Sequence, residues 1–500
     1  MLPVVIHMFS IKENLQERGR FCLRTGSPFL FMENKKDRAI AFYIFIFFLI
    51  FYFISSSGHF YASDEEVMYF LTKSLATRGS IAIEEERWAG ISSAIGREGK
   101  VYSISGIGQS LSAIPFYLAG TGIALFFPEN KERILIFSVS LLNQFITALI
   151  CVLIYLILRK FKYSSIASFS TVSFYGISTI AWPYSKYFFN VILTSFFLLL
   201  AFSLLCNSYK GPDFKKIILA GFALACSVLV RPETIILLPV FILYIYSRKD
   251  SHRMRAVWWF SGPVAIGTLL VLYYNFIRFG NIFEIGYPQD ATFSTPVLTG
   301  VYGLLFSSGK SIFLYSPVLI LSLALLPEFI RRHKNEGILV ILLFLFSLFF
   351  YARWFNWHGG RCWGPRFLVP STAFLILPAV QIFDQPLNSK RWPGIFALIL
   401  FIAGLLIQLS AVLVNYNSYF DIIEEKVNIN LNNTFFTPAF SPVFWQGKFL
   451  ISMFKYNFSR LPDLWIFRIP SGSCVFLIEF LAGTALFLLL RKIHKLCFSS

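Results

Sequence analysis

The sequence is poor in charged residues, and above all in acids. Of its 500 residues 14% are charged, and 44 Lys and Arg stand against 26 Asp and Glu. This composition, with 56% hydrophobic residues, is typical of a chain that has the lipid bilayer as its solvent. Apolar runs of about 20 residues, the length that crosses the hydrocarbon core, recur from residue 39 to residue 490. We therefore predict an all-α polytopic membrane protein of roughly 12 to 13 transmembrane or re-entrant helices, with no separate soluble domain.

Metal-binding and repeat patterns are also missing. The seven cysteines show no metal-ligand spacing and no obvious pairing, and no long repeat is visible. The net charge of +18 would suit a nucleic acid, but the basic residues fall in the short gaps between apolar runs, so we expect no nucleic-acid partner. By the positive-inside rule these gaps are cytoplasmic turns: Arg159/Lys160/Lys162, Lys210/Lys215/Lys216, Arg248/Lys249/Arg253/Arg255, Arg331/Arg332/Lys334, Lys390/Arg391 and Arg491/Lys492/Lys495.

This topology divides the chain into three parts. Residues 1–38 form a cytoplasmic N-terminal segment, in which Met32 of "MENKKDR" is an alternative start, and 491–500 form a cytoplasmic tail. Between them, 39–490 make the transmembrane domain. We expect the 110–127 run, which contains Pro115, to be re-entrant or steeply tilted. The outer loops are then 58–109, 276–310, 353–366 and 415–470.

Three adjacent acids stand where the first apolar run ends, in "YASDEEVMYFLTKSLATRG". Ser63 and Glu66 match a capping box, and apolar residues follow at helical spacing up to Gly79, so we expect a short amphipathic helix along the outer membrane surface. Acids in a first helical turn complement the helix dipole, which is one sufficient explanation of Asp64 and Glu65. The alternative, which we favour for Asp64, is an ionised carboxylate that accepts a proton from an incoming hydroxyl.

The segment "RWFNWHGGRCWGPR" at 353–366 has three arginines and three tryptophans but no acid. An aromatic belt with snorkelling arginines is the simpler interpretation. It does not explain the glycines, which bend the chain so that Arg361 and Arg366 can converge on a phosphate at the membrane surface. In the 276–310 loop, Lys310 and Arg278 are further candidates for an anion site.

The motifs "SDEEVMYF", "GKVYSISGIGQSLSAIPFYLAG", "FGNIFEIGY", "GLLFSSGKSIFLYSPVL" and "WHGGRCWGPRFLVP", in this order, resemble those of the GT-C membrane glycosyltransferases. The branch is that of the protein O-mannosyltransferases and lipid A aminoarabinose transferase. The resemblance implies a hexosyl- or pentosyltransferase that takes a sugar from a polyprenyl-phosphate donor and passes it to an unknown extracytoplasmic acceptor. It also implies a bacterial inner (cytoplasmic) membrane protein with its active site on the extracytoplasmic face.

The same resemblance assigns roles to individual residues. Asp64 matches the family's first-loop aspartate and Glu65 the acid beside it, which makes them the catalytic candidates. Arg361 and Arg366 are the candidates for the donor phosphate, with His358 and Lys310 behind them. The first loop lacks an Asp-x-Asp motif, so we expect no metal and no other cofactor.

A transporter or flippase of a lipid-linked or anionic solute is the competing function. Such proteins bury ionisable residues near the middle of the bilayer. Here Glu479 is the one acid deep within an apolar run, which favours the enzyme.

Overall fold

The structure, a computed structural model, describes residues 35–84, 92–206, 213–248, 251–384, 392–426, 434–455, 462–468 and 472–498. The alternative start at Met32 and most of the predicted N-terminal segment lie outside the described residues. So does the side chain of Glu479.

The described chain is almost entirely helical, which confirms the predicted fold class. The helices are α2 (Lys35–Ile54), α3 (Ser63–Arg78), α4 (Gly108–Ala124), α5 (Lys131–Lys160), α6 (Ser165–Ser178), α7 (Ala181–Lys186), α8 (Val191–Cys206), α9 (Phe214–Val230), α10 (Leu238–Tyr246), α11 (Arg253–Phe279), α12 (Val297–Phe306), α13 (Ile312–Tyr315), α14 (Val318–Arg332), α15 (Lys334–Arg353), α16 (Val369–Leu375), α17 (Gln381–Asp384), α18 (Trp392–Leu413), α19 (Asn417–Asp421), α21 (Pro442–Lys455) and α22 (Gly472–Phe498). Short helical turns complete it: η2 (Arg97–Gly99), η3 (Pro128–Asn130), η4 (Pro232–Leu237), η5 (Arg366–Leu368), η6 (Leu377–Val380), η7 (Ile422–Lys426), η8 (Pro438–Phe440) and η9 (Trp465–Arg468).

Six of these helical stretches are long and apolar enough to cross a membrane, judged within the described part of the chain by length and composition. They are Lys35–Ile54, Pro128–Lys160, Arg253–Phe279, Lys334–Arg353, Arg366–Asp384 and Trp392–Leu413. Val191–Cys206, Pro232–Tyr246 and Val297–Phe306 are shorter apolar helices. The chain is thus a polytopic membrane protein, while the count of roughly 12 to 13 membrane segments stays a prediction.

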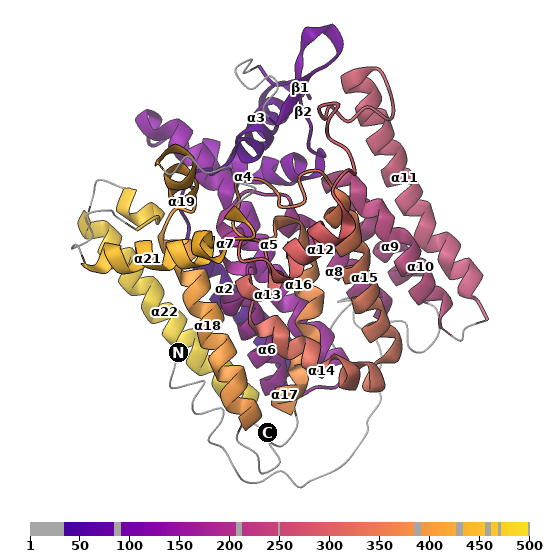
Figure 1. The fold of residues 1–500 in the computed structure, drawn as a ribbon, viewed down its shortest axis with the longest axis vertical. Helices are drawn as coiled ribbons and strands as arrows, with labels where there is room; N and C mark the ends of the chain where they lie inside the picture. Colours follow the sequence, from indigo (N-terminus) through magenta and orange to yellow (C-terminus); the bar gives the residue numbers. More distant parts are fainter. Residues whose placement is uncertain are drawn as a thin grey trace.

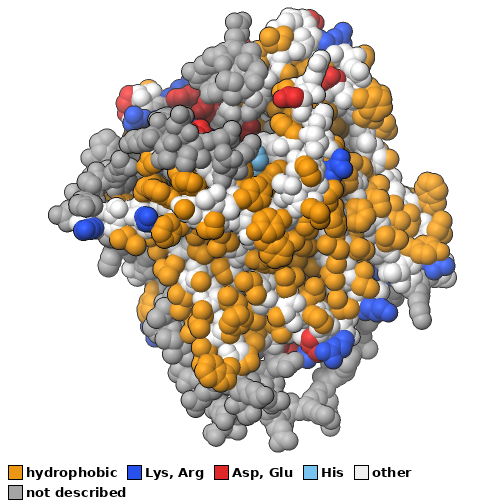
Figure 2. Space-filling model, in the orientation of Figure 1, with side chains coloured by type: hydrophobic (Ala, Val, Ile, Leu, Met, Phe, Trp, Pro, Cys, Tyr) orange, Lys and Arg blue, Asp and Glu red, His pale blue; other side chains and the backbone are white. Residues whose placement is uncertain are grey.

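The outer surface of the bundle is hydrophobic across its middle. Figure 2 shows a broad hydrophobic band on the visible face, with charged side chains toward its upper and lower margins. In Figure 1 the segment predicted as the first outer loop, with α3 and both strands, lies at the upper end of the molecule, and α14 and α17 lie at the opposite end. α4, which contains Pro115, lies at the same end as α3, and whether it crosses the membrane stays a prediction.

The first outer loop differs from its predicted form in two respects. α3 is buried along most of its length, from Val67 to Thr72, and does not lie on a surface. Residues 93–103 form a hairpin in which β1 (Ser93–Ile95) pairs antiparallel with β2 (Val101–Ser103). The hydrophobic pattern of α3 was therefore wrongly assigned to a membrane surface, because the hairpin and α4 cover this helix.

The predicted capping box at the start of α3 is also wrong. Ala62 is the N-cap, Ser63 is already helical, and the structure shows no side-chain cap at this end. The hydroxyl of Ser63 lies 2.9 Å from that of Ser92 instead. The predicted end is confirmed: Gly79 has the left-handed φ of 64° that closes the helix.

Candidate functional site

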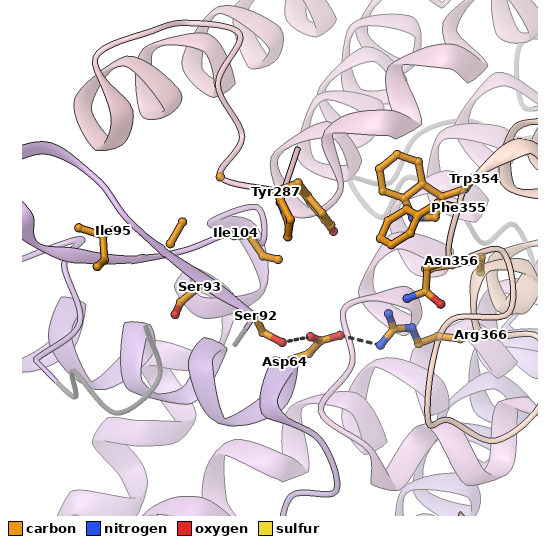
Figure 3. Close-up of a pocket in the computed structure, with 14 residues that line it drawn as sticks. Asp64, Ser92, Ser93, Ile95, Ile104, Tyr287, Trp354, Phe355, Asn356 and Arg366 are labelled. Atoms are coloured by element: carbon orange, nitrogen blue, oxygen red, sulfur yellow. Dashed lines mark hydrogen bonds and ion pairs between the residues drawn. The ribbon is translucent and has the colours of Figure 1, made fainter. Parts of the chain in front are cut away.

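The start of α3 lies against the start of η5. Oδ2 of Asp64 accepts a hydrogen bond of 2.6 Å from Nη1 of Arg366, and the two form an ion pair. Oδ1 of the same carboxylate accepts from the hydroxyl of Ser92, so the carboxylate lies between two donors (Figure 3). Ser92 has a positive φ of 56°, a costly conformation for a residue with a Cβ.

Competing effects set the ionisation of Asp64. Burial by itself raises the pKa of its carboxyl, but the guanidinium of Arg366, the hydroxyl of Ser92 and the charge of Arg231 together hold the pKa below its ordinary value. Asp64 is therefore ionised at neutral pH. A carboxylate stabilised in this way is a weak base, and it becomes a stronger one when Arg366 binds another anion.

Asp64 and Arg366 form the floor of a pocket of about 570 Å³. One wall is the hairpin segment 92–95 with Ile104, and the opposite wall is formed by 354–356. The 286–288 segment and Phe367 complete the lining. The pocket thus combines aromatic and small side chains with one ion pair, as ligand sites do when a few polar groups fix the orientation of a bound molecule.

Aromatic rings hold Arg366 in place. Its guanidinium carbon lies 4.8 Å from the ring centre of Phe189 and 5.1 Å from that of Phe367. Its side chain is 15% exposed, so the charge is largely shielded from water. Stacked and ion-paired, Arg366 is preorganised to present its remaining N–H groups to an anion in the pocket.

A second ion pair lies behind the first, and its role is not predicted from the sequence. Nη2 of Arg231 lies 2.6 Å from Oε1 of Glu233, and its guanidinium lies over the rings of Tyr351 and Phe367, at 5.4 and 5.2 Å. Arg231 and Arg366 therefore both stack on Phe367, and the charge of Arg231 acts on Asp64. The signal was the "RPE" motif at 231–233, where a proline with both charges follows an apolar run.

Glu65 connects two backbone segments. Its carboxyl is fully buried, with Oε2 accepting from the N–H of Tyr61 at 2.7 Å and Oε1 from the N–H of Phe188 at 3.1 Å. Phe188 directly precedes Phe189, on which Arg366 stacks. Burial is the largest influence on the carboxyl and raises the pKa of Glu65 to about 8. Glu65 thus holds the start of α3, which carries Asp64, next to the backbone before Phe189, on which Arg366 stacks. Glu65 itself does not line the pocket.

Lys310 and His358 support the loop that carries Arg366. The buried Nζ of Lys310 donates to the carbonyl oxygens of Gly360 and Cys362, at 3.1 and 3.0 Å. Nδ1 of His358 accepts from the N–H of Gly360, and its ring packs 4.5 Å from that of Phe435. Burial, aided by the charges of Lys310 and Arg366, lowers the pKa of His358 to about 3, so the imidazole is neutral. Neither residue lines the pocket, so their assignment to the donor phosphate stays a prediction.

The predicted glycine bend exists, but it does not bring the two arginines to one target. Gly364 has a φ of 62°, and a Cβ there would lie 2.7 Å from the ring of Tyr315. Arg361 lies 41% exposed and pairs through Nη1 with Asp421 at 3.0 Å and through Nη2 with Glu424. Arg361 thus faces the acids of the 415–470 loop while Arg366 faces Asp64.

The 415–470 loop also reaches the site through Asp463. Oδ2 of Asp463 accepts from Nζ of Lys186 at 3.2 Å and from the hydroxyl of Tyr61, and Oδ1 lies 2.9 Å from Nε2 of His59. The backbone N–H of Tyr61 also donates a hydrogen bond to Glu65. This buried cluster therefore connects the C-terminal outer segment to the start of α3.

Within the described ranges, no group of three His, Cys, Asp or Glu side chains is arranged to hold a metal ion. The expectation that the protein works without a metal or another cofactor stays a prediction.

No protein-family model matches the chain, and no curated protein matches it. Similar solved structures include ArnT from Cupriavidus metallidurans in the apo state, with 13% identity and a TM-score of 0.47. They also include the same protein bound to undecaprenyl phosphate, with 13% identity and a TM-score of 0.42. Each alignment covers 92% of this chain and 76% of the other. With both TM-scores below 0.5, we rest the function on the site itself.

Proposed function

We propose that this protein is a membrane glycosyltransferase that moves a sugar from a polyprenyl-phosphate donor to an acceptor outside the cytoplasm. The observation that carries the proposal is the Asp64–Arg366 ion pair on the floor of the outer pocket. A carboxylate to take a proton and a stacked guanidinium to hold a phosphate are the two groups that such a transfer needs. The motifs that resemble GT-C enzymes contain both residues.

In the proposed reaction, a hydroxyl oxygen of the acceptor attacks the anomeric carbon of the donor sugar from the face opposite the phosphate. The new C–O bond forms as the bond from the anomeric carbon to the phosphate oxygen breaks, and that oxygen leaves with the electron pair. Asp64 takes the hydroxyl proton, and Arg366 stabilises the charge on the departing polyprenyl phosphate. The configuration at the anomeric carbon is inverted.

The ion pair implies that the donor exchanges partners with Asp64. Arg366 is occupied by Asp64 in the free protein, and Arg231 is occupied by Glu233. A donor phosphate that binds Arg366 draws its charge away from Asp64, so the pKa of that carboxyl rises and it becomes a better base. Binding of the donor thereby makes Asp64 a better base before the hydroxyl of the acceptor substrate attacks.

The position of the site suits a lipid-linked donor. Arg366 is the first residue of a stretch that can cross a membrane, Arg366–Asp384, so its guanidinium stands at the boundary between bilayer and water. A polyprenyl tail would stay in the bilayer while its phosphate reaches Arg366. We place this end of the molecule on the extracytoplasmic side, because the basic clusters that the positive-inside rule assigns to the cytoplasm lie in the other gaps between apolar runs. We place the protein in a bacterial inner membrane.

The proposal is tested by incubating the purified protein in detergent with a panel of polyprenyl-phosphate sugars and measuring the release of polyprenyl phosphate. We expect release from at least one donor, in the presence of a hydroxyl-bearing acceptor mixture extracted from envelopes. A protein that releases none, but moves a lipid-linked sugar across reconstituted vesicles, would overturn the proposal in favour of a flippase.

A further inference from the structure

The pocket wall contains a polar group that the ion pair does not use. Asn356 lies in the loop after α15, and its side chain points into the pocket beside Arg366 (Figure 3). Its side-chain oxygen Oδ1 is buried and has no hydrogen-bond partner in the structure. A buried carbonyl oxygen left unpaired costs free energy. A ligand in the pocket recovers this free energy if the amide turns so that its oxygen meets a donor of the ligand.

The surroundings of Asn356 are fixed. Its backbone oxygen accepts from the N–H of Gly359 at 2.9 Å, and the N–H of the preceding Phe355 donates to the carbonyl oxygen of Thr292, also at 2.9 Å. The carbonyl oxygen of Trp354 accepts from the Thr295 hydroxyl at 2.8 Å. Two segments therefore hold the backbone of this wall, and with it the point from which the amide extends.

Beside the amide, the wall offers aromatic rings. The Tyr287 ring packs edge-on against that of Trp354, with 5.6 Å between their centres, and the side chains of Tyr287 and Phe355 are 40% and 36% exposed. Exposed ring surface in a pocket accepts the apolar C–H face of a ring-shaped ligand, while a single amide fixes its orientation. This combination suits a sugar ring.

The charges of the pocket exclude one class of sugar. Among the described residues that line it, Asp64 and Arg366 alone are charged, and they are paired with each other. The nearby Glu233 is paired with Arg231. The one carboxylate among these lining residues, Asp64, is the proton acceptor of the proposed reaction, so an ammonium group that paired with it would occupy the base. An ammonium group that did not pair with it would leave water uncompensated, which is costly. A hydroxyl needs only a neutral partner, which Asn356 provides.

We infer that Asn356 reads the donor sugar, with its side-chain amide hydrogen-bonding a hydroxyl of an uncharged sugar ring, so that the pocket selects neutral sugars over amino sugars. This inference rests on the proposed function. A site built to bond a hydroxyl discriminates strongly against an analogue that lacks it, because the amide is then left unpaired.

The first experiment compares transfer from polyprenyl-phosphate donors that carry a neutral sugar, the matching amino sugar and a series of single deoxy sugars. The wild-type protein should prefer the neutral donor by roughly tenfold or more in kcat/KM, since one hydrogen bond of about 1.4 kcal/mol is a factor of ten. Asn356→Leu should lose roughly that factor with the neutral donor and lose nothing with one of the deoxy donors.

The second variant reverses the charge preference. Asn356→Asp should shift the ratio of neutral to amino donor toward the amino sugar, and any competition with the phosphate for Arg366 cancels in this ratio. The exposed Asn130, at the turn before α5, supplies controls: Asn130→Leu and Asn130→Asp should keep the wild-type kcat/KM with each donor.

The inference is overturned if the wild-type protein uses the amino donor as well as the neutral one. It is also overturned if Asn356→Leu loses the same factor with every deoxy donor, or if Asn356→Asp keeps the wild-type ratio. These outcomes all require transfer, so they differ from a failure of the proposed function, in which no donor releases polyprenyl phosphate.

Discussion

Nη1 of Arg366 lies 2.6 Å from Oδ2 of Asp64, although 302 residues separate the two in the chain. One member is a stacked cation at the start of a stretch that can cross a membrane, and the other is a carboxylate whose pKa this cation helps to hold low. The pair is therefore both the polar floor of the pocket and a restraint on its base.

Replacing Arg366 should impair use of the donor more than folding. Arg366→Ala should lower kcat/KM by roughly 10²–10³, the usual effect of removing one group that stabilises developing charge. Arg366→Lys should rescue little, because an ammonium cannot reproduce the stacking on Phe189 and Phe367 or the paired donors. Steady-state kinetics with varied donor measure both effects, and full activity of Arg366→Lys would contradict the role of the guanidinium.

Arg361→Ala serves as the matched comparison. The half-exposed pairs of Arg361 with Asp421 and Glu424 predict a change in the free energy of unfolding of about 0–1 kcal/mol and a donor KM within twofold of wild type. A donor KM raised as much as in Arg366→Ala would instead support the sequence-based assignment of Arg361 to the donor phosphate.

The acidic limb of the pH profile should report the restraint on Asp64. In the free protein its pKa is lowered, so kcat/KM should rise with pH at values below about 4, the ordinary range of an aspartate. In Arg366→Ala the guanidinium no longer opposes the effect of burial, so the pKa of Asp64 should rise. The acidic limb of the residual activity should then move to higher pH. A limb that stays in place would show that Arg366 does not act on the titrating group.

Glu65 should make stability depend on pH. Its folded-state pKa of about 8 lies above the ordinary value of about 4.3, so the folded protein holds a proton that the unfolded chain has lost. The contribution of Glu65 to the free energy of unfolding is therefore present below about pH 4 and declines as the pH rises through 8. Thermal unfolding in detergent between pH 5 and pH 9 should show a smaller decline in Glu65→Gln than in wild type.

Activity separates a positioning role for Glu65 from a merely structural one. In Glu65→Gln the amide NH₂ faces a backbone N–H at one of the two contacts, so one hydrogen bond is lost. We expect this loss to lower kcat with little change in the donor KM. An unchanged kcat would contradict the positioning role.

Asp463→Asn should destabilise the end of the molecule that carries α3. Asp463 and Lys186 are 5% and 1% exposed, and removing one partner of a buried pair costs about 3–5 kcal/mol. Lys186, with His59 and Tyr61, lowers the pKa of Asp463 against the effect of burial, so this stabilisation is present at neutral pH and is lost as the pH falls below about 4. The unfolding midpoint in detergent measures the effect.

Glu98→Gln is the control for Asp463, because it removes an exposed contact with Lys100. Its unfolding midpoint should match that of the wild-type protein. Equal shifts of the unfolding midpoint in the two variants would show that the buried cluster stabilises the fold no more than an exposed ion pair does.

Composition and apolar runs predict the fold class, because a bilayer imposes the same length and polarity on every crossing helix. Asp64 and Arg366 are also visible in the sequence, since charges at a membrane boundary are few. Their pairing is not visible, nor are the acids that pair with Arg361, because both contacts join segments far apart in the chain. The capping role predicted for Glu66 is wrong because Ala62, and not Ser63, is the N-cap of α3. The catalytic role of Glu65 stays a prediction, and its contact with the N–H of Phe188 is not visible in the sequence because tertiary packing brings the two together.

The most direct test of the central claim is the release of polyprenyl phosphate by Asp64→Asn, with donor binding measured in parallel and Asp290→Asn, an exposed loop aspartate, as the control. The amide keeps the shape of the side chain but cannot take the hydroxyl proton. We expect release to fall by roughly 10²–10⁴ while the donor still binds and the control stays active. An Asp64→Asn protein that releases polyprenyl phosphate at the wild-type rate would contradict the account.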